Sequence, residues 1–348
     1  MRDLVAINGP WQVVTFLNFY MTEYGEKSPP PCTVIFYEIN DELKRVCQLI
    51  LSSYDYVDQI YDAKDLNNII ERSFNNIWIC KLFSFESKKL VDSFPLLPII
   101  LFEEGMHSYV HKQYFTLMNV IRSTDTINKK LKVSLKYFFK KEDLIRFFPE
   151  LILPTHQKKC IRNYYLFSLL ASGNPKNKIS SQYVFNVLEQ ANRVLEPESI
   201  LSSGRPCVLV VGQYFSNLDL LTFEYELNVY FRILNYYINK GFDVYWKGHP
   251  RNKMFDQKIK ESFGDNVKIL KNNSIPLEIF LISNPDIEVC GLSSSVLLYK
   301  ALLFNDKTKQ CLYLVKNQLN KNCIWYNDFL KIFSLIESNV QRINIHML

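Results

Sequence analysis

Phe242-Asp243-Val244-Tyr245-Trp246, followed by Lys247-Gly248-His249-Pro250-Arg251, is the stretch that decides the fold. The short apolar run predicts a buried strand, which the glycine, histidine and proline bring to an end. In an open α/β sheet, ligands bind beyond the carboxyl ends of the strands. His249 therefore stands where a substrate would bind, unless it only caps the turn. Gly248 would let backbone approach the substrate, and Pro250 would fix the turn.

Strand and helix patterns alternate on both sides of this stretch. Strand-like runs are expected at 4–7, 33–37, 76–80, 99–102, 207–211, 267–270, 287–290 and 311–315. Helical patterns are expected at 10–20, 41–51, 87–92, 130–139, 141–148, 182–195, 222–240, 254–263, 275–282, 294–303 and 326–336. This alternation predicts an α/β protein of two Rossmann-like domains that face a central cleft. We place them at 1–200 and 201–325, with the helix in 326–348 crossing back to the first domain.

Composition excludes several classes of protein. A chain of 348 residues is expected to form about two domains, and 48% hydrophobic and 14% aromatic residues are enough for packed cores. The net charge of +6 comes from mostly dispersed Lys and Arg, which argues against nucleic-acid binding. We interpret these residues as solvated helix faces, and the alternative is attraction to an anionic substrate or membrane surface.

The eight cysteines form no C-x-x-C pair, so we expect reduced, mostly buried thiols and no zinc site. Residues 1–8 lack a long apolar h-region, and no stretch approaches about 20 uninterrupted apolar residues, so we expect neither a signal peptide nor a membrane span. No G-x-G-x-x-G follows the first strand and no P-loop is present, which argues against a dinucleotide oxidoreductase or a P-loop NTPase.

A second strand end carries two acidic residues, Glu103 and Glu104, followed by Gly105. Adjacent side chains diverge at such a position, so one carboxylate can face the cleft while the other packs or pairs. The carboxylate in the cleft could act as a general base on a hydroxyl nucleophile. The alternative is an exposed acidic turn. His107 and His111 are spaced i, i+4, but no accompanying carboxylate supports a metal site.

A third strand end, Gly291-Leu292-Ser293-Ser294-Ser295, opens a helix. Backbone N–H groups and serine hydroxyls at a helix start bind anions such as one phosphate, although a serine that only caps the helix gives the same pattern. Glu278, near the start of another predicted helix, could accept hydrogen bonds from two ribose hydroxyls or simply complement the helix dipole.

Together these motifs resemble those of the bacterial GT-B sialyltransferases, which include the lipooligosaccharide sialyltransferases and capsular polysialyltransferases. That family has an acidic-acidic-Gly motif, a His-Pro motif and a serine motif in the order found here. The resemblance implies the GT-B fold and an inverting, metal-independent transfer of sialic acid from CMP-sialic acid to a cell-surface glycan. It implies no cofactor and a cytoplasmic location, either free or peripheral on the inner membrane.

The resemblance also implies residue roles. Glu104 would be the general base, with Glu103 as the other option, and His249 would contact the CMP phosphate and assist its departure. Lys247 and Gly248 would meet cytosine, and Glu278 would hold the ribose. Ser294 and Ser295 would hold the phosphate, and the remaining expected donor contacts are Pro250, Ser293, Gly212 and Gln213.

Two other functions remain open at this stage. One is a related GT-B transferase that uses another CMP-activated acid, such as Kdo, or a nucleotide-diphosphate sugar. The other is a non-catalytic nucleotide-binding protein of a glycan-assembly complex. The acceptor, a galactoside or a sialoside, and the linkage stay undefined.

Overall fold

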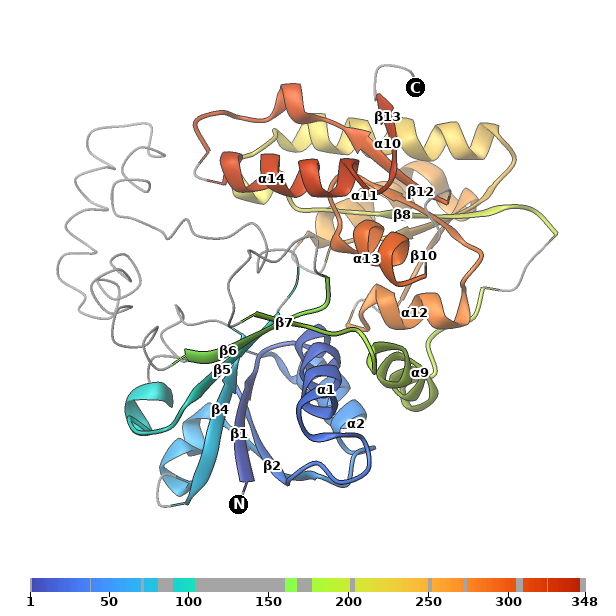
Figure 1. Ribbon diagram of the computed structural model, residues 1–348. Helices are drawn as coiled ribbons and strands as arrows, with labels where there is room; N and C mark the ends of the chain where they lie inside the picture. The colour runs from blue at the N-terminus through green and yellow to red at the C-terminus, as the bar shows by residue number, and fades with distance from the viewer. Residues whose placement is uncertain are drawn as a thin grey trace. The chain divides into compact units, whose positions relative to one another are not determined.

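The computed structural model forms two compact α/β units, Met1–Leu195 and Glu196–Leu348 (Figure 1). It describes residues 2–37, 39–69, 72–80, 90–103, 105, 160–167, 177–200, 204–249, 252–271, 274–304, 309–323 and 325–344. The predicted helices at 130–139 and 141–148 lie outside these residues.

The first unit is built on a parallel sheet with the strand order β3-β2-β1-β4-β5-β6-β7. Its strands are β1 (Arg2–Ile7), β2 (Cys32–Phe36), β3 (Val57–Asp62), β4 (Phe74–Ile79), β5 (Ile99–Phe102), β6 (Cys160–Tyr165) and β7 (Asn177–Ile179). Its long helices are α1 (Pro10–Tyr24), α2 (Asp41–Leu51) and α9 (Val184–Leu195), which pack against one another. The sheet confirms the predicted parallel α/β arrangement.

Both faces of this sheet are covered, as a parallel sheet requires. Leu4 and Ala6 pack into an apolar cluster with the residues of 63–69 and 90–97. Val5 lies in register with Trp78, so these two share the opposite face. The Trp78 indole meets the Phe16 ring of α1 edge-on at 5.8 Å. Successive side chains of β1 therefore point to opposite faces of the sheet and pack into two separate apolar layers.

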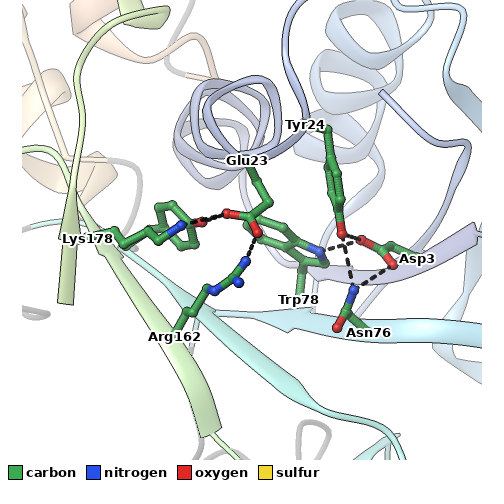
Figure 2. A network of polar contacts seen from close by, with 8 residues as sticks. Asp3, Glu23, Tyr24, Asn76, Trp78, Arg162 and Lys178 are labelled. Atoms are coloured by element: carbon green, nitrogen blue, oxygen red, sulfur yellow. Dashed lines mark hydrogen bonds and ion pairs between the residues drawn. The ribbon is translucent and has the colours of Figure 1, made fainter. Parts of the chain in front are cut away.

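A polar network closes the amino-terminal edge of the sheet around the buried Asp3 (Figure 2). The Asp3 carboxylate accepts hydrogen bonds from Trp78 Nε1 at 2.8 Å, from the Tyr24 hydroxyl at 2.7 Å and from Asn76 Nδ2 at 3.1 Å. Burying a carboxylate is costly unless its oxygens are paired. Three donors from α1 and β4 meet that need, and so join the start of β1 to its neighbours.

Glu23, at the end of α1, is the centre of a second polar network, which joins this helix to β6 and β7 (Figure 2). Its carboxylate pairs with Arg162 of β6 and with Lys178 of β7, the latter at 3.1 Å, and accepts a hydrogen bond from the Tyr164 hydroxyl. One helix end thus joins two strands that lie far from it in the sequence.

The second unit has a parallel sheet with the order β10-β9-β8-β11-β12-β13. Its strands are β8 (Cys207–Val211), β9 (Asp243–Lys247), β10 (Val267–Ile269), β11 (Glu288–Gly291), β12 (Gln310–Leu314) and β13 (Gln341–Asn344). Its helices are α10 (Phe223–Asn239), α11 (Lys253–Phe263), α12 (Leu277–Ser283), α13 (Ser295–Leu303) and α14 (Tyr326–Glu337). In chain order this is the 3-2-1-4-5-6 sheet of a dinucleotide-binding fold, with its switch point between β8 and β11.

Several details differ from the sequence predictions. Strands β3, β6, β7 and β13 were not predicted. Within the second unit, α14 packs on α13 and β13 pairs with β12. That the segment 326–348 also crosses to the first domain stays a prediction. The cysteines whose side chains are described are all free, and most are buried. In the part of the chain that is described, no helix is both long and apolar enough to cross a bilayer.

The Asp3 network generates a stability prediction. Asp3→Ala should lower the free energy of unfolding by about 3 kcal/mol, because three donors, including the fully buried Trp78 indole, lose their charged acceptor. Asp58→Ala is the control, since it removes only a partly exposed ion pair with Arg2 and should cost less than about 1 kcal/mol. Urea denaturation, monitored by intrinsic fluorescence, measures the free energy of unfolding of both variants. Equal losses in the two variants would contradict this assignment.

Candidate active site

The loops that follow β8 and β9 are joined directly. Gly212, the first residue after β8, donates its N–H to the carbonyl of Lys247 at 2.9 Å. On its other side β8 pairs with β11, where Gly291 lies in register with Val211. The Gly-Gln, Lys-Gly-His and serine motifs therefore stand at neighbouring strand ends around the switch point. This is the place where parallel sheets of this order bind nucleotides.

Gly248 occupies a position with no room for a side chain. A Cβ there would lie 1.9 Å from Oδ1 of Asp256. That same carboxylate oxygen accepts a hydrogen bond from Nε1 of the buried Trp246 at 2.7 Å. The glycine thus lets the first turns of α11 close over β9, in addition to any contact with substrate.

His249 follows at the edge of the sheet and is half-buried. Its imidazole lies against the Tyr214 ring, with centroids 4.0 Å apart and planes inclined by 34°. Its carbonyl accepts the N–H of Asn252 at 2.8 Å, which closes a turn before α11. Pro250, within that turn, lies outside the described residues.

Helix α10 anchors the loop that follows β8. Gln213 donates its N–H to the Tyr230 hydroxyl at 2.7 Å. Two further N–H groups, those of Phe215 and Ser216, donate to the buried Glu226 carboxylate at 3.2 and 2.7 Å. Burial raises the pKa of Glu226, while the hydrogen bonds to Ser216 and Phe215 oppose that rise. The loop is therefore held by two buried groups of one helix.

Glu278, the second residue of α12, is only 6% exposed. Burial raises its pKa to about 7, against the opposing effects of its own backbone N–H and of the Lys247 ammonium. A carboxylate with this pKa changes its charge near neutral pH, so ligand hydroxyls that bind its ionised form would shift that equilibrium.

The serines begin α13. Ser294 is its N-cap, and its hydroxyl oxygen accepts the N–H of Val296 at 3.4 Å. Ser293 is only 5% exposed, and its hydroxyl has no hydrogen-bond partner among the described residues. Ser295 is the first residue of the helix. A helix start with an unpaired buried hydroxyl is suited to an anion, which would satisfy that hydroxyl and meet the positive end of the helix dipole.

In the first unit, Glu103 follows β5 and is fully buried. Its Oε2 accepts the N–H of Leu166 at 2.8 Å, and its backbone N–H donates to the carbonyl of Tyr164 at 3.1 Å. Its own carbonyl accepts the Thr15 hydroxyl of α1 at 2.8 Å. Glu103 thus joins β5 to the end of β6 and to α1, which is the packing role expected for one of the two acidic residues.

Gly105 has a φ of 136°, a conformation that favours glycine, so the chain turns sharply just after the acidic pair. Glu104, His107 and His111 lie outside the described residues. The described residues hold no group of three or more His, Cys, Asp or Glu side chains that could ligate a metal.

The second unit therefore brings the donor-site residues predicted within the described part of the chain to adjoining strand ends. Sequence reasoning missed the residues that hold them there: Tyr214, Glu226, Tyr230 and Asp256. Glu226 could be recognised in the sequence only as an acidic residue in the first turn of a helix. The other three carry no local signal, because their partners are distant in the sequence.

Two parallel α/β units of this kind in one chain define the class by fold, which is GT-B. The family model for alpha-2,8-polysialyltransferases matches residues 3–313. The chain belongs to the alpha-2,8-polysialyltransferase family. It is a sialyltransferase and transfers sialic acid to a glycan, as the sequence motifs predicted.

Solved structures share the fold at low sequence identity. A 2,6-sialyltransferase from Photobacterium sp. JT-ISH-224, in a complex with CMP and lactose, has a TM-score of 0.56 at 13% identity, covering 98% of this chain and 78% of that one. MnaA of S. aureus with UDP has a TM-score of 0.53 at 10% identity, covering 97% and 88%. UDP-GlcNAc 2-epimerase of Methanocaldococcus jannaschii, with UDP-GlcNAc and UDP, has a TM-score of 0.50 at 11% identity, covering 97% and 92%. No curated protein sequence matches the chain.

The shifted pKa of Glu278 predicts a pH-dependent stability. Between pH 4.5 and about 7 the folded state binds more protons at this carboxyl than the unfolded state, so stability falls as pH rises through that window. Glu278→Gln cannot ionise and escapes this loss. Its stability relative to the parent should therefore rise by about 3 kcal/mol across the window.

Urea titrations at several pH values measure this difference. Glu261→Gln, which replaces an exposed glutamate of α11, is the control and should run parallel to the parent. A constant offset between Glu278→Gln and the parent from pH 4.5 to 7.5 would show that the carboxyl is not perturbed.

Proposed function

We propose that the protein transfers sialic acid from CMP-sialic acid to a hydroxyl of a galactoside or sialoside, by an inverting and metal-independent displacement. The main support is the arrangement at the switch point of the second unit. The unpaired Ser293 hydroxyl and the N-cap Ser294 flank one strand end, and His249 follows another. These hydrogen-bonding groups are suited to bind a single phosphate.

CMP leaves as a nucleoside monophosphate, whose growing negative charge is smaller than that of a departing diphosphate. Two hydroxyls, the helix start and the imidazole of His249 can balance that charge through oriented hydrogen bonds. The 2,6-sialyltransferase of similar fold was solved with CMP, which agrees with this donor class. Lys247 and Gly248 would contact the cytosine, and Gly212 and Gln213 would line the same pocket. Pro250 and Ser295 are the other residues expected to contact CMP-sialic acid.

The Glu278 carboxylate would hold the ribose. It is buried at the start of α12, and the Lys247 ammonium opposes the rise in its pKa. Two vicinal hydroxyls can both donate to one carboxylate, which explains a glutamate at this position better than helix-dipole compensation alone.

Glu104 would act as the general base. The adjacent Glu103 carboxylate is fully buried and already accepts the N–H of Leu166, so it is poorly suited to receive a proton from an acceptor hydroxyl. Glu104 would take that proton while the acceptor oxygen bonds to the anomeric carbon. The bond from that carbon to the CMP phosphate oxygen breaks on the opposite face, and His249 donates a hydrogen bond or proton to the leaving oxygen.

Location follows from the same activity. We propose that the enzyme works in the cytoplasm, free or peripheral on the inner membrane, in the assembly of a capsule or lipooligosaccharide. The net charge of +6 supports attraction to anionic headgroups. Vesicles of anionic lipid should co-sediment with the protein at low salt and release it at high salt, and zwitterionic vesicles should not bind it.

The catalytic assignment predicts separate effects for the two neighbouring glutamates. Glu104→Gln should retain CMP binding and lower kcat by at least about 100-fold, because it removes the base. Glu103→Gln is the matched comparison: it should reduce thermal stability and, because it disturbs only the support of the base, should lower kcat much less than Glu104→Gln does. Mass spectrometry of products from CMP-sialic acid and a panel of galactosides and sialosides measures transfer.

Thermal shift with CMP, CDP, UDP and GDP tests the donor, and addition of EDTA tests the metal independence. CMP should stabilise the protein more than UDP or GDP does, and EDTA should leave the rate unchanged. Stabilisation by UDP and not by CMP would overturn the donor assignment. Transfer by Glu104→Gln at the parent rate would overturn the base assignment.

A further inference from the structure

We propose that Tyr214 is a positioning residue for His249, and that its ring holds the imidazole in the orientation needed to meet the leaving phosphate. The inference rests on the proposed role of His249 and adds a residue that the family motifs do not contain. Tyr214 follows β8 and His249 follows β9, so the contact spans two neighbouring strand ends.

The geometry is that of a face contact between rings. The centroids lie 4.0 Å apart and the planes are inclined by 34°, so the rings overlap and do not meet edge to face. A histidine side chain has two torsions that can turn its nitrogens away from a ligand. An aromatic ring stacked on one face of the imidazole restricts both torsions while leaving the ring nitrogens at the rim.

Tyr214 can serve in this way because its own backbone is fixed on both sides. The preceding residue, Gln213, donates its N–H to the buried Tyr230 hydroxyl. The following residue, Phe215, donates its N–H to the buried Glu226 carboxylate, and its side chain is fully buried. Helix α10 therefore sets the position of the loop, and the loop sets the position of the Tyr214 ring.

The second anchor is the β8–β9 junction itself. The hydrogen bond from Gly212 N–H to the Lys247 carbonyl fixes the distance between the two strand ends just before each loop begins. Tyr214 and His249 each lie two residues beyond a partner of this bond. The rings thus meet at a fixed separation, and this arrangement pre-orients the imidazole before the donor binds.

The chemistry requires an aromatic face and not a hydroxyl. Phenylalanine should preserve the stack, whereas leucine fills similar space without a π-face. A stacked ring pair of this kind corresponds to a rate effect of roughly three- to tenfold when it acts only in the transition state. The loss should appear in kcat and not in KM for the donor, because the imidazole acts mainly on charge that develops as CMP leaves.

The experiment compares Tyr214→Leu, Tyr214→Phe and His249→Ala in the full chain, with Tyr236→Leu as the matched control on α10. Steady-state transfer from CMP-sialic acid gives kcat and KM. Proton NMR gives the chemical shift of the His249 ring proton, assigned by its disappearance in His249→Ala. Tyr214→Leu should lower kcat by roughly three- to tenfold with an unchanged KM, and should move the ring proton downfield as the ring current is lost.

Tyr214→Phe should match the parent in both measurements, and so should Tyr236→Leu. A parental kcat in Tyr214→Leu, together with a shifted ring proton, would overturn the inference, because the stack would then be lost without consequence. An unshifted ring proton in Tyr214→Leu would also overturn it. A parental kcat in His249→Ala would instead refute the role of His249 in the proposed function, and so separates the two failures.

Discussion

The hydrogen bond between Gly212 and Lys247 is the constraint on which the donor half of the molecule depends. It is the last rung between β8 and β9, and beyond it each chain leaves the sheet into a loop. A sheet with this strand order separates the crossover helices on either side of its switch point and leaves a crevice at the strand ends. Ligand-binding groups can be placed there without disturbing the core, because the strands below are already paired and buried.

The sequence alone was enough to predict the central strands β8 and β9, but it did not predict the strands near the sheet edges. β8 and β9 are apolar runs with a glycine soon after each, which is a strong local signal. β7 (Asn177–Ile179) and β13 (Gln341–Asn344) are polar at most positions, and β3 and β6 mix polar and apolar residues without a clear strand pattern. Their strand conformation comes from pairing with a neighbour, as β13 pairs with β12, and no local pattern records that neighbour. The predicted number of strands was therefore too small at the edges of both sheets.

The same distinction applies to the site. The motifs proposed to contact ligands are short and lie at strand ends, so sequence order and the parallel topology were enough to predict that they come together. The residues that hold them come from elsewhere: Tyr230 and Glu226 from α10, and Asp256 from α11. Each makes its contact through a backbone N–H or an indole N–H, which any residue or any tryptophan could supply. Such contacts leave no distinctive residue pattern, so only the structure reveals them.

The two adjacent glutamates illustrate why one motif needs both kinds of residue. A general base at a strand end must stand in a loop, where backbone freedom would scatter its position. The buried carboxylate of Glu103 bonds to the backbone at Leu166, and its carbonyl accepts the Thr15 hydroxyl, so the residue before the proposed base is fixed to β6 and to α1. Gly105 then turns the chain away. An amide at position 103 could accept the Leu166 N–H through its oxygen but would bring an N–H₂ donor into a buried position, so a carboxyl fits this place better. In the proposed mechanism, the first acid of the pair thus holds the backbone before the second, and the second takes the proton.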